Sequence, residues 1–259
     1  MSLAPVNPLP YCGSAPLPGE LLTRFNLDPR LMVALLALAG WQWWRWRRAQ
    51  GPADGRNAAG RLALAGWGVA AAAFMSPLCA LSVSLFSARI AQHMVLVLIA
   101  APLIAYGLPM QRSGRGWPVW GSALVFFFSL WFWHMPLPYE ATFSSVTWYW
   151  CMHLCLFGGA IWLWRELLHP ARRLVAVSLI AGALTSMQMG MLGAFIALAS
   201  HPLYRWHLIT TAPWGMTPLE DQQLGGALMW VPGIALFLWV AVRSVSRVWA
   251  SLEGARLHE

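Results

Sequence analysis

Uninterrupted apolar runs of about 20 residues constrain this chain more than any other feature, because a run of that length crosses a bilayer as a helix. Only 10% of the 259 residues are charged and 59% are hydrophobic, whereas a soluble domain has about 25% charged residues. The chain therefore lacks the polar residues that a water-facing surface needs. A soluble enzyme, a disordered protein and a secreted disulfide scaffold are excluded, and the pattern indicates an integral membrane protein.

We predict an all-α bundle of seven transmembrane helices that forms a single membrane domain over residues 1–259. The predicted spans are 30–46, 61–80, 89–108, 118–134, 147–165, 172–199 and 222–243. Stretches that contain glycine and proline separate these spans, as is typical of connecting loops. The sequence shows no internal repeat, and we expect no cleavable signal peptide. Four cysteines are too few and too scattered to predict a disulfide framework.

The distribution of arginine predicts the orientation of the bundle. All 17 basic residues are arginines; thirteen fall on one side of the seven-span arrangement and four on the other. Because basic residues concentrate in cytoplasmic loops, we predict an outer N-terminus and a cytoplasmic C-terminus in a multi-pass protein of the bacterial inner membrane. The net charge of +8 then reflects contact with anionic membrane lipid, and we expect no nucleic-acid partner.

Three histidines on three predicted spans lie at the same depth, in the outer third of the bundle. They are His93, His134 and His153. Ionisable side chains at membrane depth are costly and usually mark a site. Imidazole binds copper, zinc, iron and nickel, and thioether sulfur favours Cu(I). Because methionines accompany these histidines, we predict a copper site that is centred on the three imidazoles.

Further residues at the outer end of the bundle are predicted to complete this site. As additional metal ligands we select Met191, Met229 and His207. We also select polar residues that are expected to hydrogen-bond to the metal ligands and orient them without binding the metal: Asp221, Gln222, Gln223 and Glu140. An acid such as Asp221 at the start of a helix also stabilises the helix dipole, and that alternative remains open. Gly225 and Gly226 are expected to let a neighbouring backbone approach closely.

Several motifs along the chain carry a family resemblance. They are Tyr11-Cys12-Gly13, Asn26-Leu27-Asp28-Pro29, Ser76-Pro77-Leu78, Leu85-Phe86-Ser87-Ala88, Gln92-His93-Met94, Trp133-His134, Pro138-Tyr139-Glu140-Ala141, Asp221-Gln222-Gln223-Leu224-Gly225-Gly226 and Met229-Trp230-Val231-Pro232-Gly233. Together they resemble the heptahelical cytochrome c oxidase assembly factor family CtaG, which is distinct from the single-span copper chaperone that shares this name.

The resemblance implies a metallochaperone-like role in respiratory chain biogenesis. The chain would help to mature an aa-type oxidase by binding or delivering copper at the periplasmic face, with oxidase subunits and other copper chaperones as partners. One position departs from the family pattern, because many relatives place a second histidine where this chain has Arg89.

Other functions stay open at this stage. One alternative is a copper transporter, although the inner half of the predicted bundle lacks a matching ladder of His, Met or Cys. Another is a b-type haem protein with two histidines on different helices as axial ligands. An enzyme is not expected, because the sequence shows no paired carboxylates and no nucleophile–base arrangement, and we predict no catalytic residues.

Overall fold

The computed structural model describes residues 9–48, 53–108, 117–168 and 175–231, with isolated positions at 238, 242, 245, 246 and 249. Within these ranges the regular elements are helices and no strand occurs. The α-helices are α1 (Pro29–Arg48), α2 (Ala53–Met75), α3 (Pro77–Ser84), α4 (Phe86–Met94), α5 (Ala101–Tyr106), α6 (Trp117–His134), α7 (Pro136–Ser144), α8 (Val146–His153), α9 (Gly159–Leu168) and α10 (Val175–Ala197). A further helix covers 218–231.

Short helices of other types join these elements. The π-helical segments are η2 (Val95–Ala100) and η3 (Leu154–Gly158). The 3-10 helices are η1 (Pro18–Thr23), η5 (Arg205–Leu208) and η6 (Ala212–Trp214). The segment η2 connects α4 to α5, and η3 connects α8 to α9, so each π segment lies inside one longer helical run.

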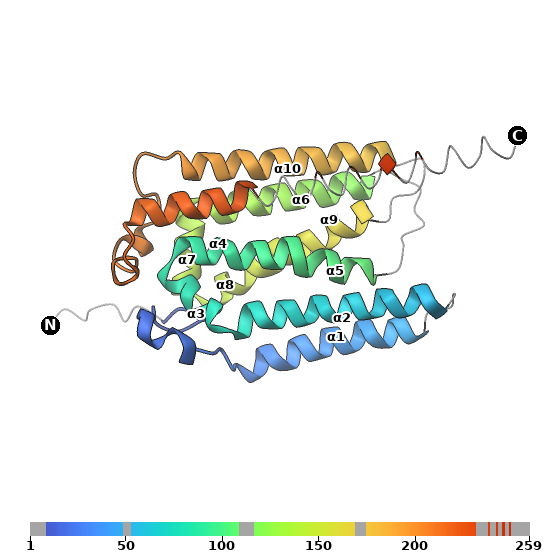
Figure 1. Ribbon diagram of the computed structural model, residues 1–259, viewed down its shortest axis with the longest axis horizontal. Helices are drawn as coiled ribbons and strands as arrows, with labels where there is room; N and C mark the ends of the chain where they lie inside the picture. The colour runs from blue at the N-terminus through green and yellow to red at the C-terminus, as the bar shows by residue number, and fades with distance from the viewer. Residues whose placement is uncertain are drawn as a thin grey trace, which may run out of the picture.

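The long helices lie side by side along the long axis of the molecule (Figure 1). Residues 9–28, α3, α7 and the connection 198–217 gather at one end of this bundle, at the left of Figure 1. We call this the capped end.

In the described part of the chain, four helical runs are long and apolar enough to cross a membrane: Ala58–Met75, Phe86–Tyr106, Val146–Leu168 and Val175–Ala197. The prediction of an all-helical, multi-pass membrane protein is thus confirmed in its general form. The number of seven spans and the direction of the termini stay predictions, since residues 232–237 and most positions beyond them lie outside the described residues.

Two predicted span boundaries are wrong for local reasons. The span 61–80 ends at Met75, because Ser76 is extended and its Oγ accepts a hydrogen bond from the Leu78 amide, which starts the new helix α3. The span 89–108 begins earlier, at Phe86. The Asp221 side chain supplies the cap there, from a part of the chain that local sequence patterns do not connect to this position.

Residues 53–106 and 117–168 share one succession of elements, although the sequence showed no internal repeat. Each unit has a long helix, an extended residue, a short helix that begins with proline, and a second extended residue. A helix that carries a histidine as its eighth residue follows, and a π-helical segment comes directly after it or one residue later. The described residues therefore repeat an order of elements although no repeat is evident in the sequence.

The repeat pairs residues that sequence comparison within the chain did not pair. His93 on α4 corresponds to His153 on α8, and each precedes a π segment. Met75, the last residue of α2, corresponds to His134, the last residue of α6. Helical geometry and proline positions are preserved between the units while side chains differ, so the duplication is visible only in three dimensions.

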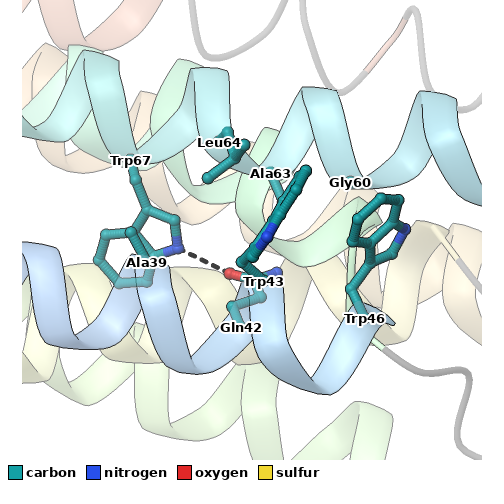
Figure 2. A pocket seen from close by; sticks show the side chains of 9 residues that line it. Ala39, Gln42, Trp43, Trp46, Gly60, Ala63, Leu64 and Trp67 are labelled. Atoms are coloured by element: carbon teal, nitrogen blue, oxygen red, sulfur yellow. Dashed lines mark hydrogen bonds between the residues drawn. The ribbon is translucent and has the colours of Figure 1, made fainter. Parts of the chain in front are cut away.

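The opposite end of the α1–α2 pair is held by a buried amide (Figure 2). Gln42 Oε1 accepts a 2.7 Å hydrogen bond from Trp67 Nε1, and Gln42 Nε2 donates to the Ile104 carbonyl at 3.0 Å. The Trp46 ring packs so closely on Gly60 that a Cβ there would lie 2.5 Å from Cε2 of the ring. Polar groups in an apolar interior need such partners, and this amide therefore ties α1, α2 and α5 together.

The helix 218–231 packs closely on two neighbours through glycine, as the sequence predicts. A Cβ on Gly226 would lie 2.5 Å from the Ala197 amide nitrogen and 2.6 Å from the Gly193 carbonyl oxygen. A Cβ on Gly225 would lie 2.4 Å from Cδ1 of Phe86. The prediction of close backbone approach is thus confirmed.

Replacing Gly226 by alanine should destabilise the bundle, because the added methyl meets backbone atoms that cannot move independently. Overpacking of this kind costs about 1–3 kcal/mol. Gly68→Ala in α2 is the matched control, since a Cβ there meets nothing within 4 Å and glycine in a helix interior costs about 0.5–1 kcal/mol. Thermal unfolding in detergent should show a lower midpoint for Gly226→Ala only; equal midpoints for the two variants would refute the contact.

Candidate metal site

The structure brings the three predicted histidines together near the capped end. The ring centroids of His93 and His153 are 5.3 Å apart, and those of His93 and His134 are 6.0 Å apart. All three side chains are buried, with 3–5% of their surface exposed. Residues from α4, α6 and α8 therefore meet in one apolar interior.

Backbone hydrogen bonds decide which ring nitrogens remain available. His134 Nδ1 donates to the Leu130 carbonyl at 2.7 Å, and His153 Nδ1 donates to the Tyr149 carbonyl at 2.9 Å. Because a carbonyl oxygen only accepts, the proton of each neutral ring sits on Nδ1 and the Nε2 lone pair is free. Neither Nε2 has a hydrogen-bond partner in the described part of the chain.

His93 has no hydrogen-bond partner for either ring nitrogen among the described residues. Buried polar atoms without partners are uncommon in folded proteins. Here four such nitrogen atoms belong to three adjacent imidazoles. Because a neutral His93 ring carries one N–H, the cluster presents three imidazole lone pairs and one N–H donor without partners.

The spacing of the rings suits a shared ion. Two imidazoles that bind one metal at about 2.0 Å have ring centroids roughly 5–6 Å apart, which matches the two observed separations. In the described ranges, however, no group of three or more His, Cys, Asp or Glu side chains already has the geometry of a metal site. The rings must therefore reorient to bind an ion together.

A buried arginine lies on the same helix face as His93, one turn earlier. Arg89 is only 2% exposed, and its Nη2 donates to Thr142 Oγ1 at 2.8 Å. Its guanidinium carbon lies 4.2 Å from the ring centroid of Phe143 and 5.1 Å from that of Tyr139. Since aromatic faces attract cations, these rings replace a carboxylate partner. The cluster thus has a buried positive charge one turn away from His93.

A cavity of about 610 Å³ extends from the rim of the capped end to His153. Tyr11, Asp28 and Trp150 belong to its lining, together with apolar residues of α1 and η3. His153 is thus the member of the histidine cluster that lines this cavity.

His207 does not join the cluster. Its Nε2 is bonded to the Tyr139 hydroxyl at 2.8 Å, and its Nδ1 lies 3.2 Å from the Ser84 carbonyl. Both nitrogens are thus engaged, and the ring fastens the connection 198–217 to α3 and α7. Burial lowers the pKa of His207 to about 3.

The two selected methionines have different environments. Met191 is 44% exposed and lines a pocket between α6 and α10. Met229 is fully buried in the main hydrophobic core. The burial of these two side chains does not mark either of them as a metal ligand.

The polar residues chosen to orient the ligands bind backbone groups elsewhere. Asp221 accepts hydrogen bonds from the amides of Phe86 and Ser87, at 2.6 and 3.0 Å, and from Ser87 Oγ. Gln222 Oε1 accepts from the Leu203 amide at 2.6 Å.

The other two of these residues are Gln223, which lies at the surface, and Glu140, which contacts the connection 198–217. Gln223 is exposed, and Glu140 accepts from the Arg205 amide at 2.8 Å. Asp221, Gln222 and Glu140 thus organise the capped end, and the described contacts include no direct hydrogen bond from any of the four residues to the three histidines.

Sequence reasoning missed a disulfide between Cys12 and Cys79. The cysteine count argued against a disulfide framework, but it did not address a single disulfide. The available signal was positional: Cys12 lies in the predicted outer N-terminal segment, and Cys79 lies at the predicted outer end of the span 61–80. Cys151 and Cys155 are free.

Acid should loosen the connection that His207 holds. The unfolded chain binds a proton near pH 6.5, the ordinary pKa, whereas the folded protein does so only near 3. The stability contributed by neutral His207 is therefore complete above pH 6.5 and is lost as the pH falls toward 3, with about 2 kcal/mol lost at pH 5. The His207→Gln variant should lose less thermal stability than the parent between pH 7 and pH 5. If the parent and the variant lose the same thermal stability between pH 7 and pH 5, His207 is not the group that causes the acid sensitivity.

The chain matches a known family over most of its length. A family model described as cytochrome c oxidase caa3 assembly factor (Caa3_CtaG) matches residues 37–251. No curated protein and no solved structure matches the chain. The matched region includes all three clustered histidines and both repeat units, and it covers most of the chain. The chain therefore belongs to the family of cytochrome c oxidase caa3 assembly factors.

Proposed function

We propose that this assembly factor binds copper through His93, His134 and His153 and presents it for insertion into the oxidase. The observation that carries the proposal is the cluster of buried imidazole nitrogens without partners. Neutral imidazoles bind borderline and soft metals. The protein acts here by binding and transfer, and no catalytic step is assigned to it.

The charge around the cluster favours Cu(I) over divalent ions. The three histidines are neutral donors, and the nearby Arg89 side chain adds a positive charge. Coulomb repulsion between this charge and a bound ion is proportional to the charge of the ion. A divalent ion is therefore repelled twice as strongly as Cu(I), in a region where burial reduces solvent screening.

The repeat supplies a thioether candidate for the same site. Met75 has the position in its unit that His134 has in the other. The adjacent residue, Phe74, has its ring centroid 5.0 Å from that of His153. A methionine at this position suits Cu(I), and we propose Met75 as the sulfur ligand in place of Met191 and Met229.

Alanine substitution of His93, His134 or His153 should each weaken copper binding. We expect losses larger than the roughly 10–100-fold that outer-shell partners of a metal ligand cause. His201→Ala is the matched control, because His201 is exposed in the same capped end. Copper content and Cu(I) affinity of detergent-purified protein are the measurements, with thermal unfolding to confirm the fold.

Two results would contradict the copper site. One is unchanged copper affinity in both His93→Ala and His153→Ala. The other is a Soret band in the purified protein that disappears in these variants, since it would assign the histidines to haem.

We further propose that the capped end faces the outside of the bacterial inner membrane. The disulfide at this end supports the orientation, because disulfides persist in oxidising compartments. The arginine distribution supports it independently. Copper would then be handled at the outer face, where oxidase subunits and copper chaperones are the expected partners.

Reporter fusions test this orientation. Alkaline phosphatase is active only after export, so fusion after Ile209, which is 83% exposed at the capped end, should give high activity. Fusion after Pro170 should give little. The reverse pattern would place the histidine cluster near the cytoplasm and contradict the proposed site of delivery.

A further inference from the structure

The bonded cysteines Cys12 and Cys79 lie beside the histidine cluster. The Tyr149 hydroxyl oxygen is 3.6 Å from Cys12 Sγ and 3.9 Å from Cys79 Sγ. The ring of the same tyrosine has its centroid 4.3 Å from that of His153. One side chain thus separates two sulfur atoms from a proposed copper ligand.

Local structure brings the two cysteines together from distant parts of the chain. Cys12 lies in a tight turn closed by a 2.8 Å hydrogen bond from the Gly13 amide to the Pro10 carbonyl, with Gly13 at φ +87°. Cys79 lies in the first turn of α3 and is fully buried. Their Cα atoms are 5.5 Å apart.

Other contacts already hold the N-terminal segment on the bundle. The Tyr11 hydroxyl donates to Asp28 Oδ2 at 2.7 Å, and the backbone N–H of Asn26 donates to the Met75 carbonyl at 2.9 Å. Ser84 Oγ donates to the Pro16 carbonyl at 3.1 Å. Because these bonds position the segment without the disulfide, breaking the S–S bond leaves both sulfur atoms near Tyr149.

The sulfur pair also has an approach route and a stabilising environment. Tyr11, next to Cys12, lines the same cavity as His153. The Tyr149 hydroxyl can donate to a thiolate formed on either cysteine. The side-chain Nδ2 of Asn26 lies 3.7 Å from Cys79 Sγ. The Arg89 guanidinium lies 5.8 Å from the Tyr149 ring centroid, so a buried positive charge is available near the anionic sulfurs.

We propose that the reduced Cys12–Cys79 pair is a second Cu(I) site, which exchanges copper with the histidine cluster and is closed by disulfide formation. Thiolate is the softest protein ligand and prefers Cu(I). The family match begins at residue 37 and does not include Cys12. The match does include Cys79, and the family description names no role for either cysteine.

The chemistry is a thiol–disulfide exchange followed by metal binding. A dithiol reductant, of the class that thiol oxidoreductases provide, attacks the S–S bond and becomes a disulfide itself, while Cys12 and Cys79 become two thiols. Binding of one Cu(I) then forms two Cu–S bonds and releases two protons. Removal of Cu(I) and two-electron oxidation of the thiols by a disulfide oxidant restore the bridge.

Cu(I) titration of the full-length protein in detergent, against a chromophoric Cu(I) chelator, tests the proposal. The protein is compared with the disulfide intact and after reduction and removal of the reductant. We expect reduction to add one Cu(I) per chain. The Cys12→Ser/Cys79→Ser variant should lack this increment. Cys151→Ser/Cys155→Ser, which removes the two free cysteines, should retain it.

The histidine variants separate this proposal from the proposed function. In the His93→Ala/His153→Ala protein the increment on reduction should persist even when the first copper is lost, and X-ray absorption should show sulfur ligands. Equal stoichiometry of oxidised and reduced wild-type protein would overturn the cysteine site, as would loss of the increment in Cys151→Ser/Cys155→Ser. The oxidised and reduced wild-type samples decide the question even if the cysteine variant does not fold.

Discussion

The carboxylate of Asp221 fixes the position of the helix on which the histidine cluster depends. It accepts hydrogen bonds from the Phe86 and Ser87 amides, which are free at the first turn of α4 and carry the positive end of its dipole. The helix 218–231 and α4 are thereby held in one relative register. Because His93 follows two turns later, a bond to residue 221 determines the depth at which its ring meets His134 and His153.

The two repeat units explain why histidines from different helices meet at one level. In each unit a proline-led short helix and an extended residue precede the helix that carries the histidine. Each of these helices then becomes π-helical after His93 or His153. A π segment widens the helix locally and is common at functional sites. The helices that carry His93 and His153 thus have the same backbone irregularity beside the cluster, although they come from different parts of the chain.

Sequence patterns predicted the parts of the structure that depend on composition and local spacing. Apolar runs located the long helices, the cost of ionisable groups in membranes selected the three histidines, and Gly225-Gly226 indicated a close helix contact. Tertiary pairing was not predictable in this way. Asp221 was assigned to a ligand environment, but its partners are amides that lie 135 and 134 residues away in the chain. His207 was grouped with the other histidines by depth, although Tyr139 and Ser84 occupy its nitrogens.

Arg89 shows how the capped end tolerates a buried charge without a carboxylate. Moving an arginine from water into an apolar interior is costly unless other groups compensate. Phe143 and Tyr139 present their ring faces, and Thr142 accepts one hydrogen bond. These three residues belong to α7, the short helix of the second repeat unit, whereas Arg89 belongs to α4 of the first. The cation therefore joins the two units beside the histidines. Because it lies one turn from His93, it contributes a positive electrostatic potential at the cluster, which acts on any ion that binds there.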